Sequence, residues 1–306
     1  MGLTQLRLGH HLVAFLDVLG QRERFKQLQL PKTPEEHAEV AEVLRQTAGF
    51  VLELRKTFAD QFAVFESGLT ALKQHISEPI CPKFVGFSDS FVTSVPLRGE
   101  GSPLASITTV FSALTASAVV MITALASQHP LRGGIDVGLA TEIAPGEIYG
   151  TALERAYVLE SKGAEYPRIM IGEELWNYLN VARAHFSAQT APEVKTVISI
   201  IDRILQLIAV DADGKRILDY LGPVMSDLQG SDSKFASGMI QPLYAFVIAE
   251  QQRVTASGDP KLISRYNVLR GYVESRLHLW ELQPVPRRAA ADAEGKPFPL
   301  NSHGNA

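Results

Sequence analysis

The chain has 306 residues, of which 46% are hydrophobic and 20% charged. This balance is that of a globular protein with a large core, in one domain or two, and not that of a disordered chain. The formal net charge of −4 and the isoelectric point near 6.1 exclude a broad basic surface, so we expect no nucleic-acid polymer as a partner. The single cysteine, Cys81, excludes an intrachain disulfide and a cysteine-rich zinc site.

The sequence predicts a cytoplasmic protein without a membrane segment. Its start shows no basic stretch followed by a long apolar one. Residues 104–126 carry no charge and are long enough to span a bilayer. They contain seven Ser or Thr residues, however, and their large apolar residues recur at the three- and four-residue spacing of a helix. We therefore expect a buried amphipathic helix with hydroxyl groups on its other face.

The first predicted strand is Leu12–Leu16, which is followed by Asp17 and by a turn at Gly20. Residues 33–76 read as helical. Thr33 and Glu36 have the spacing of a capping box at the start of this helix, with a proline between them in the first turn.

The segment from Lys83 to Val95 has two apolar runs on either side of Asp89. This pattern predicts a tight β-hairpin with Asp89 at or near its tip. The helix of residues 104–126 follows. Further on, strands are expected at 131–140, 142–149 and 167–171, and helices at 150–162 and 173–181. This order predicts an α+β fold with a ferredoxin-like βαββαβ core and an added hairpin.

The pattern is weaker beyond residue 185. Residues 194–208 are helical by periodicity, 211–214 resemble a hairpin turn, and 241–280 read as two helices broken at 258–260. We therefore predict three parts, which are an α+β domain at 1–183, a mostly helical C-terminal extension at 184–283, and a disordered tail at 284–306.

Asp17 and Asp89 each lie at the edge of an apolar strand-like run. An ionised carboxylate is costly to remove from water unless it is paired or binds a metal. Two such residues predict one divalent-cation site built by the fold. The alternatives are a helix N-cap for Asp17 and an ordinary turn residue for Asp89.

Four segments taken together, with their order and spacing, resemble class III nucleotide cyclases. They are Phe15–Gly20, Phe84–Val92, Arg132–Gly138 and Glu147–Gly150. The resemblance implies that Asp17 and Asp89 are catalytic residues that bind two Mg²⁺ or Mn²⁺ ions. In the family, one ion activates the ribose 3′-hydroxyl group and the other holds the triphosphate.

The resemblance also implies a homodimer in which each active site takes residues from both protomers. Glu147 occupies the place of the carboxylate that recognises the base. We expect four further residues to line the substrate: Gly20, Phe87, Tyr149 and Gly150.

This sequence departs from the family pattern at three positions. Val85 stands where adenylate cyclases have a base-recognising lysine, four residues before Asp89. Glu154 and Val158 replace the asparagine and arginine that stabilise the transition state. Arg155 shares a helical face with Val158 and is our candidate for this charge, with Arg168 as an alternative that is more simply a surface arginine.

The segment Gly150–Ser161, with the residues up to Ile169, resembles the pyrimidine cyclases of bacterial Pycsar antiphage systems more closely. This implies a uridylate cyclase that converts UTP to cyclic UMP, the second messenger that activates a separate effector protein. The alternatives are a cytidylate cyclase, a purine nucleotide cyclase, and a cyclase-like module that binds a nucleotide without converting it.

Overall fold

The computed structural model describes residues 8–26, 28–68, 80–87, 89–97, 103–190, 192–229 and 233–285. Within these residues, eight strands form one sheet in the order β2-β3-β1-β4-β6-β8-β7, and β5 pairs with β4 outside this path. The strands are β1 (Gly9–Val18), β2 (Lys83–Phe87), β3 (Ser90–Leu97), β4 (Leu131–Ala144), β5 (Glu147–Gly150), β6 (Ile169–Ile171), β7 (Ile208–Val210) and β8 (Arg216–Leu218).

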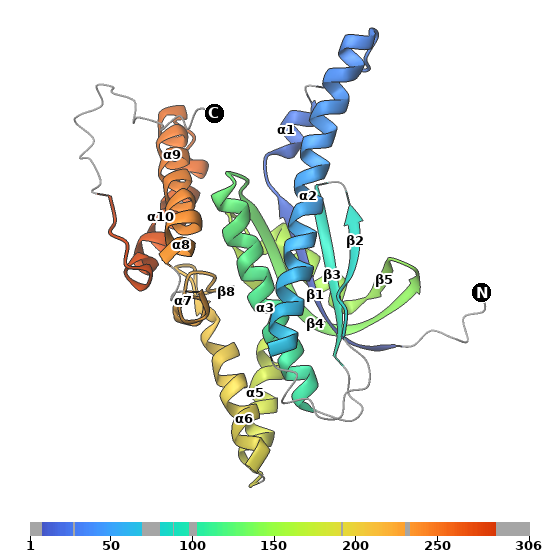
Figure 1. Cartoon of the computed structure of the whole chain (residues 1–306), viewed down its shortest axis with the longest axis vertical. Coiled ribbons are helices and arrows are strands. Elements are labelled where there is room, and N and C mark those ends of the chain that lie inside the picture. The colour runs from blue at the N-terminus through green and yellow to red at the C-terminus, as the bar shows by residue number, and fades with distance from the viewer. Residues whose placement is uncertain are drawn as a thin grey trace.

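The helices surround this sheet (Figure 1). They are α1 (Gln21–Lys26), α2 (Pro34–Gly68), α3 (Pro103–Ala126), α4 (Thr151–Val158), α5 (Glu173–Ser187), α6 (Pro192–Gln206), α7 (Pro223–Gln229), α8 (Ser233–Phe235), α9 (Gln241–Ser257) and α10 (Pro260–Arg276). Two π-helical turns, Leu159–Gly163 and Ala236–Ile240, and one 3-10 turn, Leu277–Trp280, complete the described elements.

The first six large elements have the predicted ferredoxin-like arrangement. The chain runs β1-α2-β2-β3-α3-β4, and the sheet order of these strands is β2-β3-β1-β4. β1 lies in the centre and is antiparallel to both β3 and β4. β5 then turns back along the far end of β4 as the added hairpin. The α+β class and the βαββαβ core predicted from the sequence are therefore confirmed.

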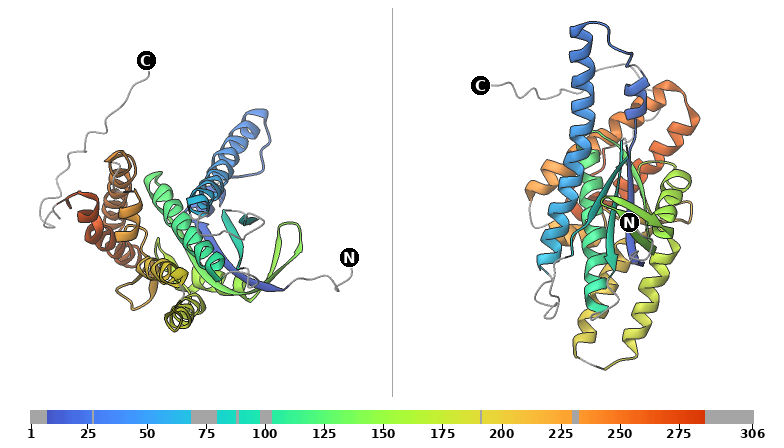
Figure 2. Two further views of the ribbon diagram at one scale, coloured as in Figure 1. Left: turned by 60° about the horizontal axis from the view of Figure 1, so that its bottom comes forward. Right: turned by 90° about the vertical axis from the view of Figure 1, so that its right-hand side faces the viewer.

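Alternating residues of β1 contact two different layers. Leu12, Ala14 and Leu16 belong to the large core that includes α2, α3 and the C-terminal helices, and we call this side of the sheet the α3 face. Val13 and Phe15 pack with residues of α4 on the opposite side, which we call the α4 face. Asp17 follows the same alternation, so its side chain lies on the α4 face. Figure 2 shows the helical layers from two further directions.

Helix α3 is long and apolar enough to cross a membrane, but 89% of its most apolar window is buried inside the fold. It has the burial of a core helix in a soluble protein, because α2, α6 and α9 pack around it. The face that carries its hydroxyl groups also lies inside the fold. Those of Thr115 and Ser117, for example, are buried and donate to the carbonyl oxygens of Phe111 and Ala113, four residues earlier.

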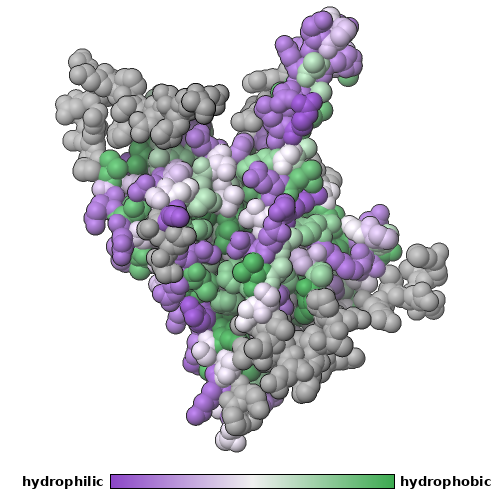
Figure 3. Space-filling model, viewed as in Figure 1, coloured by the Kyte–Doolittle hydropathy of each residue, from purple (hydrophilic) through white to green (hydrophobic). Residues whose placement is uncertain are grey.

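Helix α2 begins with the capping box that the sequence predicts. The Glu36 N–H donates to Thr33 Oγ1 at 3.2 Å, and the Thr33 N–H donates to Glu36 Oε2 at 3.3 Å. The buried side chains of α2 all follow residue 46, and its first turns extend beyond the sheet (Figure 1). Figure 3 shows mostly hydrophilic residues over this projecting end.

The C-terminal region continues the sheet of the core. Helices α6, α9 and α10 lie where helices are predicted, and β7 and β8 form the expected hairpin. β8 pairs with β6, so these two strands extend the sheet that begins in the core. Helix α5 crosses the predicted domain boundary at residues 183 and 184. The division into domains stays a prediction, and most of the expected tail lies outside the described residues.

Candidate functional site

The fold brings Asp17 and Asp89 to the same end of neighbouring strands. Asp17 pairs with Ser90 in the register of β1 and β3, and the Val18 N–H donates to the Asp89 carbonyl oxygen at 3.2 Å. Asp17 lies inside β1 and not at a helix N-cap. Asp89 is in the turn between β2 and β3, as predicted. The Asp17 side chain is 18% exposed, so it is reachable from solvent.

Two charged residues that the sequence reasoning did not single out contact Asp17. Arg132, opposite Asp17 on β4, has Nη2 at 3.3 Å from Asp17 Oδ2 and Nε at 2.5 Å from Glu160 Oε1. Glu160, in the π-helical turn after α4, is buried. Burial raises the pKa of the Glu160 carboxyl, Arg132 lowers it, and the charge of Asp17 raises it again. The only signal for this cluster in the sequence is the alternation of side chains along β4, which places Arg132 on the α4 face.

Helix α4 lies close to the sheet because β4 has a glycine at the contact. A Cβ atom on Gly134 would collide with the carbonyl oxygen of Ala156 and with Leu159. Gly150, immediately before α4, has φ +146, and a Cβ there would meet the carbonyl oxygen of Leu139. These two glycines allow the helix to bring Glu160 next to Asp17.

The donor set at Asp17 and Asp89 fits a magnesium-type ion bound together with a nucleotide. Mg²⁺ in phosphoryl-transfer sites is held by one or two carboxylates, and the phosphates complete its coordination. Among the described residues there is no group of three or more His, Cys, Asp or Glu side chains that could hold a metal by themselves. Asp17 and Asp89 alone therefore do not make a closed metal cage within the described part of the chain.

The residues predicted to contact the base lie at the opposite end of the sheet. Glu147 and Tyr149 are on β5, which pairs with the far end of β4. Arg132, opposite Asp17, and Ala144, opposite Glu147, are twelve residues apart along β4, which is roughly 40 Å of strand. One protomer therefore does not bring Asp17 and Glu147 together.

The side chains of β5 alternate between the two sides of the β4–β5 hairpin. Ile148 is buried against the α4 face, whereas Glu147 is exposed and Tyr149 is 70% exposed. Gly20 has φ +87 in the turn after β1, as expected for a turn glycine. The side chain of Phe87 lies outside the described residues. Val85 packs against the small core of the α4 face.

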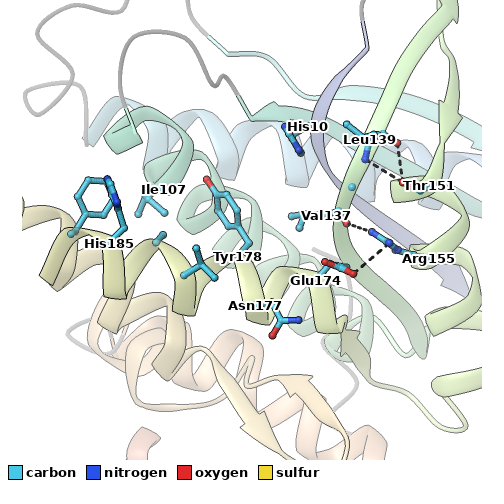
Figure 4. Close-up of a pocket in the computed structure, with 14 residues that line it drawn as sticks. His10, Ile107, Val137, Leu139, Thr151, Arg155, Glu174, Asn177, Tyr178 and His185 are labelled. Carbon is cyan, nitrogen blue, oxygen red and sulfur yellow. Dashed lines mark hydrogen bonds and ion pairs between the residues drawn. The ribbon is translucent and has the colours of Figure 1, made fainter. Parts of the chain in front are cut away.

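Arg155 is not near Asp17. Its Nη1 donates to the Val137 carbonyl oxygen at 3.2 Å, and its Nη2 lies 3.5 Å from Glu174 Oε1 (Figure 4). It lines a cavity of about 760 Å³ whose apolar walls come from β4 and α5, with Tyr178 and His185 on the α5 side. Arg155 thus satisfies a backbone group at the free edge of β4.

Arg168, the alternative arginine, is not on the surface. Its side chain is 2% exposed and pairs with Asp211 at 2.5 Å and Asp213 at 2.7 Å. The hydrogen bond from Arg168 holds the pKa of Asp213 at about 2. Tyr166 also donates to Asp211. This cluster joins the β7–β8 hairpin to the residues before β6, so Arg168 has a structural role.

No protein-family model and no curated protein matches the chain. Solved structures with similarity to it include the adenylyl cyclase CyaB from P. aeruginosa, with 15% identity, a TM-score of 0.40, and coverage of 58% of this chain and 83% of that one. A class III adenylyl cyclase-like ATP-binding protein from Pseudomonas aeruginosa has 16% identity and a TM-score of 0.37, over 65% of this chain and 42% of that one. The catalytic core of a rhodopsin-guanylyl cyclase with converted specificity, in complex with ATPalphaS, has 12% identity and a TM-score of 0.33, over 56% and 83% of the two chains.

Proposed function

We propose that this protein is a metal-dependent nucleotide cyclase that converts UTP to 3′,5′-cyclic UMP and pyrophosphate. The observation that carries the proposal is the adjacency of Asp17 and Asp89 at the open end of β1 and the β2–β3 turn. Asp17 lies in the last part of β1, and Asp89 lies in the turn beside it. In this proposal the two carboxylates are the protein ligands of metal ions whose coordination the nucleotide completes.

Bound Mg²⁺ or Mn²⁺ would lower the pKa of the attacking 3′-hydroxyl group and neutralise the leaving pyrophosphate. The residues of the chain hold the site in shape. Arg132 keeps the Asp17 carboxylate in place through its 3.3 Å contact, and Glu160 holds Arg132 from the other side. Arg132 also places a positive charge beside the carboxylates, where a triphosphate would lie.

The active enzyme is then a homodimer with two composite sites. Asp17 and Glu147 lie at opposite ends of the sheet, beside residues that are twelve apart along β4, so a nucleotide can touch both only if they come from different protomers. Glu147 and Tyr149 are exposed and available for such contact. We assign Glu147 to the base, and Tyr149 and Gly150 to the pocket wall.

The preference for a pyrimidine rests on Val85. It packs in the small core of the α4 face, where it cannot donate a hydrogen bond to adenine. The choice between UTP and CTP follows the sequence resemblance alone. By the same resemblance the product is a messenger in antiphage defence that acts on a separate effector, and the enzyme is cytoplasmic.

The proposal is tested by incubating the purified protein with each of the four nucleoside triphosphates and Mn²⁺ or Mg²⁺, and by resolving the products chromatographically. We expect cyclic UMP from the wild type and a loss on the order of 100-fold or more in Asp17→Ala and Asp89→Ala. Asp60→Ala, which removes an exposed carboxylate on α2, is the matched control and should keep full activity. Full activity in both site variants would overturn the metal assignment.

A second candidate function is nucleotide binding without turnover. It is favoured by one observation, which is that Arg155 bonds Val137 and Glu174 and so leaves α4 without an arginine directed at a substrate. Nucleotide binding measured by calorimetry, together with no cyclic product from any of the four nucleotides, would establish this function.

A further inference from the structure

The ion pair between Lys83 and Glu142 joins two strands that are not neighbours. Lys83 is on β2 and Glu142 is on β4, and both β3 and β1 lie between them in the sheet. On a flat sheet, three strand spacings amount to about 14 Å, and Lys83 is in line with Asp136, six residues or about 20 Å along β4 from Glu142, so the two side chains could not meet. The sheet must therefore curl at this end, so that the far end of β4 approaches β2 over the α4 face.

Glu142 contacts both the edge strand β2 and the β4–β5 turn. One carboxylate oxygen contacts the Lys83 ammonium, and the other, Oε1, accepts the Gly146 N–H at 3.0 Å. Gly146 has φ +79 in the β4–β5 turn, and Glu147 is the next residue. A register irregularity between Glu142 and Ala144 bends the strand here. One carboxylate thus fixes both the position of the hairpin and the shape of its turn.

A polar pair lies on the same face as this ion pair. His11 Nδ1 and Ser94 Oγ are 2.9 Å apart, and Ser94 is buried. The charges of Lys83 and Glu142 both act on His11. The Lys83 and Glu142 side chains are 49% and 29% exposed. The ion pair therefore lies beside the hydrogen-bonded pair of His11 and Ser94 and is not a contact between two freely moving surface side chains.

We propose that Lys83 and Glu142 form a clasp that sets the position of the β4–β5 hairpin, and thereby of Glu147, for selection of the nucleotide base. Both are positioning residues that act through Glu147 and do not touch the substrate. This rests on the proposed function, because the clasp matters for substrate only if Glu147 faces the base. Glu142 faces one side of the hairpin and Glu147 the other, so the clasp presents Glu147 outward to the partner protomer.

Hydrogen–deuterium exchange of the nucleotide-free protein tests the clasp without reference to catalysis. Lys83→Met and Glu142→Gln should speed exchange in residues 143–149 about two- to five-fold, the range expected for loss of a partly exposed ion pair. Lys83→Arg should keep the wild-type rate. Lys56→Met, which breaks an exposed pair on α2, is the matched control and should leave the hairpin unchanged. Unchanged exchange in both clasp variants would overturn the clasp.

Binding of UTP and ATP to the same variants, measured by calorimetry, tests the role in base selection. We expect the ratio of the two dissociation constants to move about two- to five-fold toward equality in Lys83→Met and Glu142→Gln, with Lys83→Arg retaining the wild-type ratio. Faster exchange with an unchanged ratio would overturn the positioning role and leave the proposed function standing. A wild-type protein that binds no nucleotide would overturn the proposed function and this role, while the exchange result would still decide the clasp.

Discussion

If each active site is shared between two protomers, two inactive variants should restore each other. Asp17→Ala removes a metal ligand from one half of the site, and Glu147→Ala removes the base contact from the other half. Within one chain the two residues lie at opposite ends of β4, beside Arg132 and Ala144, so each substitution should leave the other half intact. Alone, Asp17→Ala should lose on the order of 100-fold in kcat/KM and Glu147→Ala about 10- to 100-fold.

Equal amounts of the two variants, co-expressed or mixed under conditions that exchange subunits, form mixed dimers in about half of all cases. Each mixed dimer has one site with both substitutions and one with neither. The mixture should therefore recover about one quarter of the wild-type turnover. The assay is cyclic nucleotide formation per mole of protein, with differently tagged chains to count the mixed dimers.

The controls are each variant alone and a mixture of Asp17→Ala with Asp89→Ala. These two substitutions fall in the same half of the site, so their mixture should recover nothing. Mixed dimers that form in the expected proportion without any recovered turnover would refute the shared site. Recovery with the Asp17 and Asp89 variants would place those two residues in different halves and refute the geometry.

Three further outcomes follow from the contacts of single residues. Arg168→Met leaves the buried Asp211 carboxylate without its ion-pair partner and should lower the unfolding free energy by about 3–5 kcal/mol in urea titrations. Arg183→Met, in an exposed pair, should change it by less than about 1 kcal/mol, and equal effects would contradict this. Burial lowers the pKa of His11 below 6.5, so the folded state binds this proton more weakly than the unfolded chain. The contribution of His11 to stability is therefore fully present above about pH 6.5 and is lost as the pH falls below it. His11→Gln should make the urea midpoint less dependent on pH between about pH 6.5 and pH 5. Gly134→Ala forces α4 off the sheet, and circular dichroism melting should show a loss of about 1–3 kcal/mol or more, together with loss of activity.

Local signals in the sequence predicted local structure well. Thr33 and Glu36 marked the start of α2 because a capping box involves only neighbouring residues. The two apolar runs around Asp89 gave the β2–β3 hairpin for the same reason. The β4–β5 hairpin and the two long C-terminal helices, α9 and α10, were also expected from periodicity and turn residues.

Features that depend on the direction of a side chain or on the curl of the sheet could not be predicted in the same way. We expected Arg155 to supply the charge that is missing at Val158. Successive residues of a helix point about 100° apart, however, and at position 155 the side chain points to the edge of β4. Arg168 has no sequence signal for burial, because Asp211 and Asp213 reach it only through tertiary packing. The pair of Lys83 and Glu142 depends on the curl of the sheet, which periodicity does not encode.

The position of α3 in the chain affects how the protein must be made. On the ribosome, residues 103–126 are complete before any of α6 or α9, which cover α3 in the folded protein. Roughly 115 further residues must be added before α9 begins, which takes about 6–23 s at typical rates of synthesis. Until α6 is made, about midway through that interval, a nascent helix with the hydropathy of a membrane span has neither of these two helices to cover it. Synthesis in a cell thus exposes this chain to insertion into membranes and to chaperones, and slower translation should increase both.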